Sequence, residues 1–392
     1  MTDGLSFAPL ISVLLPTRNR LDLAKGAIET VRRQAYGNWE LVVADNCSDE
    51  DVGAYVERLG DPRIRCTRSE TFLPVTENWN RAVDAAEGDY VVMLGDDDGL
   101  VPGYFERVVA ALDVLGRPDL LYHGAYHFTF PEAIPGQSEG RLSDETSRAC
   151  FLAGRRGPSL LAREEAEAAA RRALGMEMVY GFNMQYFLFG RAMLERLRGY
   201  GGVFQGPYPD FYAANMALLL ADRIGILPEP MTIIGISPKS FGHFYFSGRE
   251  REGTGLLNNE GYLGALPDGL RRRLLPGTDM NTHWLVSVSL VQRHLDERFG
   301  LSLGVERYRK MQILAALRGS AGKTSLATLW PLLSGGERVF AALAYALLKV
   351  LGPLKMPALA VLRRLMGKGA HHRPVALACP YRTMIDVFEG LR

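Results

Sequence analysis

The residues best suited to chemistry are three consecutive aspartates, Asp96, Asp97 and Asp98, which follow an apolar run. Adjacent carboxylates near a protein surface repel one another by on the order of 1 kcal/mol per pair. A divalent cation offsets this repulsion, and Mg²⁺ or Mn²⁺ typically binds through one or two carboxylates together with substrate phosphates. The run therefore indicates a metal–phosphate site, and the alternative interpretation is a solvated acidic turn.

Two earlier apolar runs also end in polar residues. The first ends in Pro16, Thr17, Arg18 and Asn19, and the second ends at Asp45. The Asp45 carboxylate suits either a cap of the following turn or an acceptor for hydrogen bonds from a nucleotide base or ribose. No G-x-G-x-x-G fingerprint follows the first run, which disfavours a dehydrogenase.

The elements that must position these residues alternate between strand and helix. Continuous apolar runs are typical of parallel strands that are buried on both faces. The alternation predicts an α/β fold with a doubly wound, mostly parallel sheet flanked by helices. Ligands bind such sheets at the carboxyl ends of the strands, so we expect the polar strand ends to meet. The expected strands are 10–17, 39–44, 64–67 and 90–94. Helices are expected at 20–35 and 76–86, and a further helix is expected to begin at a capping box formed by Ser48 and Asp51.

The rest of the chain is less regular. An aromatic region contains an expected helix at 211–221 and an apolar segment at 224–236. A segment rich in Gly, Pro and Arg then resembles a linker or mobile loop, and the pattern after it is helical. The expected division is a ligand-binding domain at 1–250 with halves at about 8–118 and 119–250, a linker at 251–280, and a C-terminal helical extension at 281–392.

Composition excludes several classes of protein. The formal net charge of +1 argues against a nucleic acid partner. The four cysteines include no Cys-x-x-Cys pair, so we expect a reducing compartment without a disulfide framework or zinc cluster. The first residues lack the features of a secretion signal, and no uncharged apolar run reaches the roughly 18 residues of a membrane span. The expected location is the cytoplasm.

The C-terminal segment 326–392 is basic and apolar. It contains nine Lys or Arg and only three acids, with apolar stretches such as VFAALAYALLKVL among them. One interpretation is a membrane-interface helix attracted to anionic lipid. The other is a helical packing or homo-oligomer element whose apolar face is buried.

Three motifs occur in a fixed order: ISVLLPTRNR, ELVVADNCSDE and NWNRAVDAAEGDYVVMLGDDDGLVPGYFE. In order and spacing they resemble the family 2 inverting glycosyltransferases of the GT-A fold. The resemblance covers about residues 10–245. It implies a GT-A-like fold and a metal-dependent enzyme that uses Mg²⁺ or Mn²⁺.

The resemblance also implies a donor site. Pro16, Thr17 and Asn19 are expected to line the base and ribose pocket, and Asp45 is expected to bind the nucleobase. Asn80, in the helix before the acidic run, is expected to face the nucleotide.

The family's metal motif aligns on Asp97, with Asp96 toward the ribose and Asp98 supporting or sharing the metal. Many members carry another aspartate where this chain has Gly95, so the number of ligands differs from the usual pattern. Arg18 is a candidate for stabilising charge on the donor phosphates.

The resemblance places an acidic base just ahead of a helix, about 100 residues beyond the metal motif. YPDFYAANMALL matches that region and nominates Asp210, where a helix N-cap is the alternative. Glu229 is the nearest competing acid, but its position between two prolines indicates a structural role.

The implied reaction moves a sugar from a nucleotide-diphospho-sugar to a saccharide or lipid-linked saccharide acceptor, in bacterial surface polysaccharide or glycolipid synthesis. A lipid-linked acceptor would suit a peripheral position on the inner face of the membrane. The alternatives are a catalytically silent nucleotide-sugar-binding protein and a sugar nucleotidyltransferase. The latter needs a glycine-rich loop after the first strand, where PTRNR stands instead.

Overall fold

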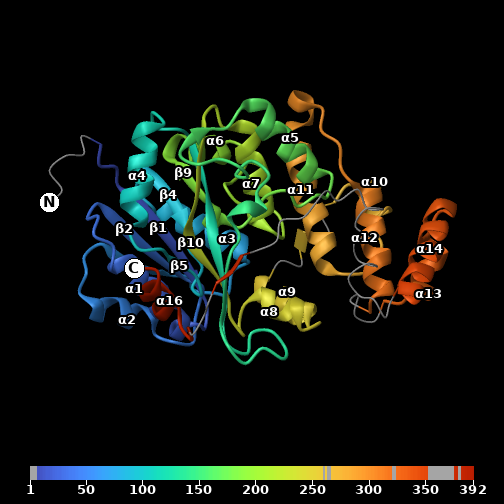
Figure 1. Ribbon diagram of the computed structural model, residues 1–392, viewed down its shortest axis with the longest axis horizontal. Coiled ribbons are helices and arrows are strands. Elements are labelled where there is room, and N and C mark those ends of the chain that lie inside the picture. Colours follow the sequence, from blue (N-terminus) through green and yellow to red (C-terminus); the bar gives the residue numbers. More distant parts are fainter. Residues whose placement is uncertain (1–6, 259–260, 263–265, 320–323, 352–374, 378–380) are drawn as a thin grey trace.

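The computed structural model describes residues 7–258, 261–262, 266–319, 324–351, 375–377 and 381–392. Within them, eleven strands form one sheet with helices on both faces (Figure 1). The strands are β1 Ile11–Thr17, β2 Trp39–Asp45, β3 Ile64–Arg68, β4 Tyr90–Met93, β5 Gly99–Leu100, β6 Leu120–Thr129, β7 Arg141–Asp144, β8 Ser159–Leu160, β9 Phe187–Gly190, β10 Ile224–Ile236 and β11 Val375–Leu377. The helices are α1 Leu21–Arg32, α2 Val52–Leu59, α3 Val75–Ala85, α4 Tyr104–Val114, α5 Arg163–Leu174, α6 Arg191–Arg198, α7 Pro209–Leu220, α8 Phe241–Phe246, α9 Glu250–Leu257, α10 Asp268–Arg271, α11 Asp279–Phe299, α12 Val305–Leu317, α13 Leu326–Leu329, α14 Gly335–Leu351 and α16 Met384–Gly390.

The sheet combines a parallel part with an antiparallel part. Its main strand order is β11-β7-β6-β9-β4-β1-β2-β3, and β10 pairs with β5, β6 and β8. Strands β4, β1, β2 and β3 are parallel, whereas β9 is antiparallel to both β4 and β6. The predicted fold class, a helix-flanked and mostly parallel α/β sheet, is confirmed, and antiparallel strands complete it.

Side chains of β1 alternate between two hydrophobic cores. Ile11, Val13 and Leu15 pack with residues of α1 and α4 on one face of the sheet. Leu14 points to the other face, where the core includes residues of α3, α5, α7 and α11. Burial on both faces explains why the first strand is continuously apolar.

Helix α2 is capped by Asp51, whose Oδ1 accepts a hydrogen bond from Ala54 N at 2.8 Å. The predicted capping role of Ser48 is wrong. Ser48 N instead donates to Asp45 Oδ1 at 3.0 Å, and its Oγ accepts from Asn19 N at 3.0 Å. Ser48 therefore joins two loops at the carboxyl end of the sheet.

The C-terminal part divides differently from the expectation. The expected linker contains α9 and α10, and α11, α12 and α14 extend the molecule to one side (Figure 1). The last residues do not stay with these helices: β11 pairs with β7 at the sheet edge, and α16 packs on α1 (Figure 1). The reason is that α16 has an apolar face, including Met384 and Val387, that is buried against the sheet domain. None of the described helices has the length and hydropathy needed to cross a membrane.

Candidate active site

The carboxyl ends of β1, β2 and β4 share one rim of the sheet. Thr17 pairs with Asp45 in the β1–β2 ladder. Thr17 Oγ1 also donates a hydrogen bond to Asp96 Oδ2 at 2.8 Å. Thr17 therefore connects the end of the second strand to the acidic run, and Pro16 precedes it in β1, paired with Ala44.

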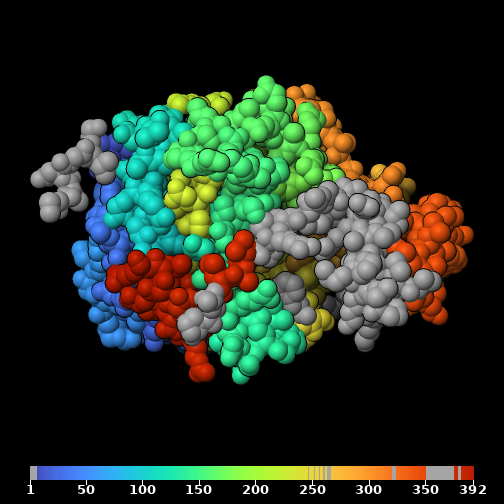
Figure 2. Space-filling view, viewed as in Figure 1, coloured from blue at the N-terminus to red at the C-terminus, as the bar shows by residue number. Residues whose placement is uncertain are grey.

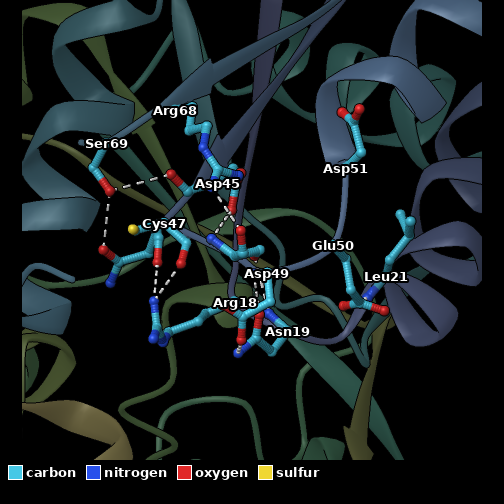
Figure 3. A network of polar contacts seen from close by, with 12 residues as sticks. Arg18, Asn19, Leu21, Asp45, Cys47, Asp49, Glu50, Asp51, Arg68 and Ser69 are labelled. Carbon is cyan, nitrogen blue, oxygen red and sulfur yellow. Dashed lines mark hydrogen bonds and ion pairs between the residues drawn. The ribbon is translucent and has the colours of Figure 1, made fainter. Parts of the chain in front are cut away.

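Asp45 is fully buried, and both of its carboxylate oxygens are bound inside the protein (Figure 3). Oδ2 accepts from Arg68 Nη1 at 2.6 Å, and Oδ1 accepts from Ser48 N at 3.0 Å. The Arg68 side chain is 51% exposed, so it lies between Asp45 and solvent. A base that reaches Asp45 must therefore displace or contact Arg68, which the sequence motifs did not single out.

Arg18 and Asn19 tie the β1–α1 loop to the β2–α2 loop (Figure 3). Arg18 Nη1 donates to two backbone carbonyls of the latter loop, each at 2.6 Å, and its guanidinium lies 4.0 Å from the centre of the Phe72 ring. Asn19 has a positive φ of 52° and exchanges two hydrogen bonds with Asp49. Both residues fix the shape of the rim.

Asn80 lies on α3 and holds the loop before α7. Its Nδ2 donates to Phe204 O at 2.9 Å, and its Oδ1 accepts from Phe204 N at 3.0 Å. A contact between Asn80 and a nucleotide requires this clamp to open.

The buried Asp96 forms an ion pair with the partly exposed Arg20, with Nη1 and Oδ1 separated by 3.1 Å. Burial raises the pKa of Asp96 to about 6, against the opposing effect of Arg20. Burial also acts to lower the pKa of Arg20, but Asp96, Asp97 and Asp98 raise it above its usual value. Of the two arginines that follow the first strand, the sequence nominated Arg18 and not Arg20. The structure brings this cation to the acidic run.

Asp97 is fixed from the far end of β10. Ser237 Oγ donates to Asp97 Oδ2 at 2.8 Å, and no hydrogen bond from the described residues reaches Oδ1. The carboxylate is 8% exposed. Ser237 directly follows a long apolar strand. Because ligands bind at the carboxyl ends of strands, this position was the sequence signal that could have identified Ser237 as a site residue.

Both carboxylate oxygens of Asp98 accept hydrogen bonds in this conformation. Its Oδ1 accepts from Gly235 N at 2.7 Å, and its Oδ2 accepts from Gly95 N at 2.7 Å and Gln185 Nε2 at 2.5 Å. Burial, and then repulsion from Asp97, raise the pKa of Asp98 to about 8. In this conformation the carboxyl group of Asp98 braces the loop, and its share in metal binding stays a prediction. No sequence pattern pointed to Gln185.

The conformation of Asp98 explains the glycine at position 95. A Cβ on Gly95 would lie 2.4 Å from Asp98 Oδ2, well inside normal contact distance. A side chain at position 95 and the inward orientation of Asp98 therefore exclude each other.

The acidic run fits a divalent cation only with help from a ligand. No cluster of three or more His, Cys, Asp or Glu suited to a metal occurs among the residues that the structure describes. Asp97 offers one free carboxylate oxygen, and one or two carboxylates plus substrate phosphates are sufficient for Mg²⁺. The donor set therefore fits Mg²⁺ or Mn²⁺ bound together with a diphosphate.

Asp210 lies in the first turn of α7, after the N-cap residue Tyr208, so the alternative role as an N-cap does not apply. Its Oδ1 accepts from Phe211 N at 3.0 Å. Burial raises the pKa of Asp210 to about 7. The competing acid Glu229 is 46% exposed and forms an ion pair with Arg107 at 3.5 Å. This pairing is consistent with the structural role expected for Glu229.

Residues on both sides of Asp210 pack against segments that hold the acidic run. The Tyr208 ring contacts Phe241, with centroids 5.7 Å apart, and Phe241 is four residues after Ser237. Phe211 contacts Phe182 at 4.5 Å, three residues before Gln185. These contacts connect the first turn of α7 to the same rim.

Two buried polar atoms near Asp210 have no hydrogen-bond partner among the described residues. They are the hydroxyl of Tyr208 and Nδ1 of His283, and the two rings lie 5.3 Å apart. Buried polar atoms normally bind a partner, so these two atoms are suited to a ligand hydroxyl or a water molecule.

A surface hollow of about 720 Å³ lies away from the acidic run, between α2 and β3. Its lining includes five carboxylates (Asp49, Glu50, Asp51, Glu57 and Asp61) but only two arginines. Such an excess of negative charge disfavours a diphosphate inside this hollow, although Ser48 and Arg68 of the rim also line it.

Residues 12–139, about a third of the chain, match the model of the family described as "Glycosyl transferase family 2". The match includes β1, β2 and the acidic run. The resemblance to this family that the motifs indicate is confirmed over this stretch.

Individual relatives agree. The chain is 37% identical over 120 residues to the "Putative colanic acid biosynthesis glycosyl transferase WcaA" of Escherichia coli, covering 30% of this chain and 43% of the relative. It is 34% identical over 98 residues to the "GalNAc(5)-diNAcBac-PP-undecaprenol beta-1,3-glucosyltransferase" of Campylobacter jejuni, covering 24% and 32%. The chain thus spans less than half the length of these curated relatives. The crystal structure of S. aureus TarS 1-349 in complex with UDP has 16% identity and a TM-score of 0.44, covering 88% of this chain and 91% of that one.

Proposed function

We propose that this chain is an inverting glycosyltransferase that moves a sugar from a nucleotide-diphospho-sugar to an acceptor hydroxyl. The observation that carries the proposal is that Asp97, with one free oxygen, and Asp210, with a raised pKa, belong to segments tied to one rim. The family match of residues 12–139 supports the same class of reaction. We further propose that the domain expected at 1–250 is the catalytic domain.

The donor is proposed to bind along the ends of β1, β2 and β4. Asp97 would hold Mg²⁺ or Mn²⁺, which supplies positive charge to the leaving diphosphate. Thr17 and Asp96 are already joined by a hydrogen bond of 2.8 Å, at the position proposed for the ribose. Arg18 and Arg20 add fixed positive charge at the start of α1. The nucleobase is proposed to contact Asp45 through the Arg68 side of the rim.

Asp210 is proposed to take the proton of the acceptor hydroxyl. A carboxylate whose pKa lies near neutral pH is a more effective base than one with an ordinary pKa, and burial raises the pKa of Asp210 to about 7. The activated hydroxyl attacks the anomeric carbon as the bond to the diphosphate breaks. A single displacement of this kind inverts the configuration of the sugar.

The acceptor is proposed to be a saccharide, either free or lipid-linked, in bacterial surface polysaccharide or glycolipid synthesis. The unpartnered Tyr208 hydroxyl and His283 Nδ1 suit a substrate rich in hydroxyl groups. The Campylobacter jejuni relative is named for an acceptor on PP-undecaprenol, which supports the lipid-linked alternative. A lipid-linked acceptor would suit the position that we propose on the inner face of the membrane.

The test is turnover of a panel of UDP-, GDP- and dTDP-sugars with Mn²⁺, measured as release of nucleoside diphosphate. We expect one class of donor to turn over, and the Asp210→Asn variant to bind that donor without turnover. Proton NMR of the product sugar then reports the anomeric configuration. A wild-type protein that binds a donor but never turns it over with any acceptor would instead be a silent binding protein.

A further inference from the structure

Helix α14 presents apolar side chains to solvent. Val339 is 61% exposed and Leu343 is 63% exposed, and the exposed residues Ala342 and Ala346 complete the same stripe. These four positions are spaced three or four residues apart, so they share one helix face. The opposite face, including Ala344, packs against α12. Both faces of α14 are therefore apolar, although within the described part of the chain only one of them packs against another helix.

The apolar stripe is flanked by exposed aromatic rings that carry cations. Trp330 is 40% exposed, and the Arg338 guanidinium lies 5.8 Å from its ring centre. Tyr345 is 47% exposed, and Lys349 Nζ lies 5.1 Å from its ring centre. Aromatic rings next to basic groups are typical of surfaces at the level of lipid headgroups.

The charge of this surface is positive. Glu337, the acid of the α14 segment, is bound by Arg309 at 2.5 Å, and this contact lowers the pKa of Glu337 to about 2. The described residues 326–351 include two basic side chains, Arg338 and Lys349, beside this one bound acid. Basic residues beside an apolar helix face attract anionic lipid.

We propose that α14 and the preceding turn form a docking surface for an anionic phospholipid bilayer. The surface consists of Trp330, Leu332, Arg338, Val339, Leu343 and Tyr345. Figures 1 and 2 show α14, in orange-red, at the end of the molecule opposite the blue N-terminal strands, so docking there leaves the rim of the sheet accessible. The inference concerns binding to lipid and does not depend on sugar transfer.

The experiment is co-sedimentation of the full chain with two kinds of sonicated vesicle. One contains phosphatidylcholine alone, and the other also contains about 30 mol% phosphatidylglycerol, which makes its surface anionic. We expect binding to the anionic vesicles and at least tenfold weaker binding of the Val339→Glu/Leu343→Glu variant. The matched control is Val114→Glu, because Val114 is 78% exposed at the end of α4 and lies outside the surface. The control should bind as the wild type does.

A second measurement of lipid contact uses a substitution that does not alter the charge of the surface. Brominated lipids should quench the fluorescence of Trp330, and Trp330→Phe should remove the quenching. Equal binding by the double variant and the wild type, or absence of binding to anionic vesicles, overturns the proposal. The proposal is also overturned if the wild type is a dimer in sedimentation velocity and the double variant is a monomer, because the surface is then an interface between two copies.

Discussion

Ser237 Oγ donates a 2.8 Å hydrogen bond to Asp97 Oδ2, although the two residues are 140 positions apart in the chain. Asp98 is bound to the same strand through Gly235 N. The end of β10 therefore holds the acidic loop from the side opposite β1. This arrangement leaves Asp97 Oδ1 as the oxygen on which the proposed metal site depends.

Replacing Asp97 tests the metal ligand. Asp97→Ala should weaken donor binding in the presence of Mn²⁺ by at least about tenfold, or about 1.4 kcal/mol, because the cation loses its protein carboxylate. Calorimetric titration with and without Mn²⁺ measures the effect. The control is Asp113→Ala on the exposed surface of α4, which should bind normally. Unchanged, Mn²⁺-dependent binding by Asp97→Ala excludes Asp97 as the ligand.

Replacing Gly235 tests the support of the loop by β10. A Cβ at this position would lie 1.8 Å from Asp97 O, so the backbone would have to move to relieve the clash. We expect Gly235→Ala to cost about 1–3 kcal/mol of unfolding free energy and to weaken donor binding. Gly242→Ala is the matched control, since its Cβ would meet Ile236 at an ordinary 3.4 Å. Chemical denaturation compares the two, and equal stability contradicts the observed packing.

Gly95 and Asp98 should be coupled. Gly95→Asp alone introduces a side chain where Asp98 Oδ2 lies, so we expect a loss of about 1–3 kcal/mol. Adding Asp98→Ala vacates that space, and the double variant should recover part of the loss. A double-mutant cycle gives the coupling energy, which should exceed about 0.5 kcal/mol for residues in contact. Additive effects would show that the two positions are independent.

The pH dependence of the rate reports on Asp210. A base works in its deprotonated form, and burial raises the pKa of Asp210 to about 7. The rate should therefore fall as the pH is lowered through about 7 and reach a plateau above it. Asp210→Asn should reduce kcat by about 10²–10⁴-fold without weakening donor binding.

The matched control for this prediction is Glu229→Gln. Glu229 is the competing acid that the sequence offered, but it is half exposed and paired with Arg107. Its variant should keep the activity and the pH profile of the wild type. Activity that persists in Asp210→Asn and is lost in Glu229→Gln reverses the assignment.

The sequence predicted the first half of the fold well because its signals are local. Continuous apolar runs marked β1, β2 and β4, and parallel pairing then required Thr17 and Asp45 to be neighbours. The antiparallel strand β9 and the return of α16 to α1 depend on contacts between distant segments, for which one sequence contains no periodic signal.

The residues of the candidate site likewise differ in whether local sequence signals could identify them. Asp97 and Asp210 were found because motif and position nominated them. Arg20, Gln185 and Ser237 were not, because their importance comes from the carboxylates that they reach across the fold. The inward orientation of Asp98 is likewise set partly by distant groups, because Gly235 N and Gln185 Nε2 bind its carboxyl group together with the nearby Gly95 N.

The central claim is that Asp97 and a donor diphosphate bind one cation at the rim. The most direct measurement is the thermal shift of wild-type protein and Asp97→Ala with UDP-, GDP- and dTDP-sugars, with and without Mn²⁺. Binding at a hundredfold excess over Kd stabilises a fold by about 2.7 kcal/mol. We predict that one donor class raises the Tm of the wild type only with Mn²⁺ and raises that of Asp97→Ala clearly less. An equal shift in both proteins, or no shift with any donor, would contradict the claim.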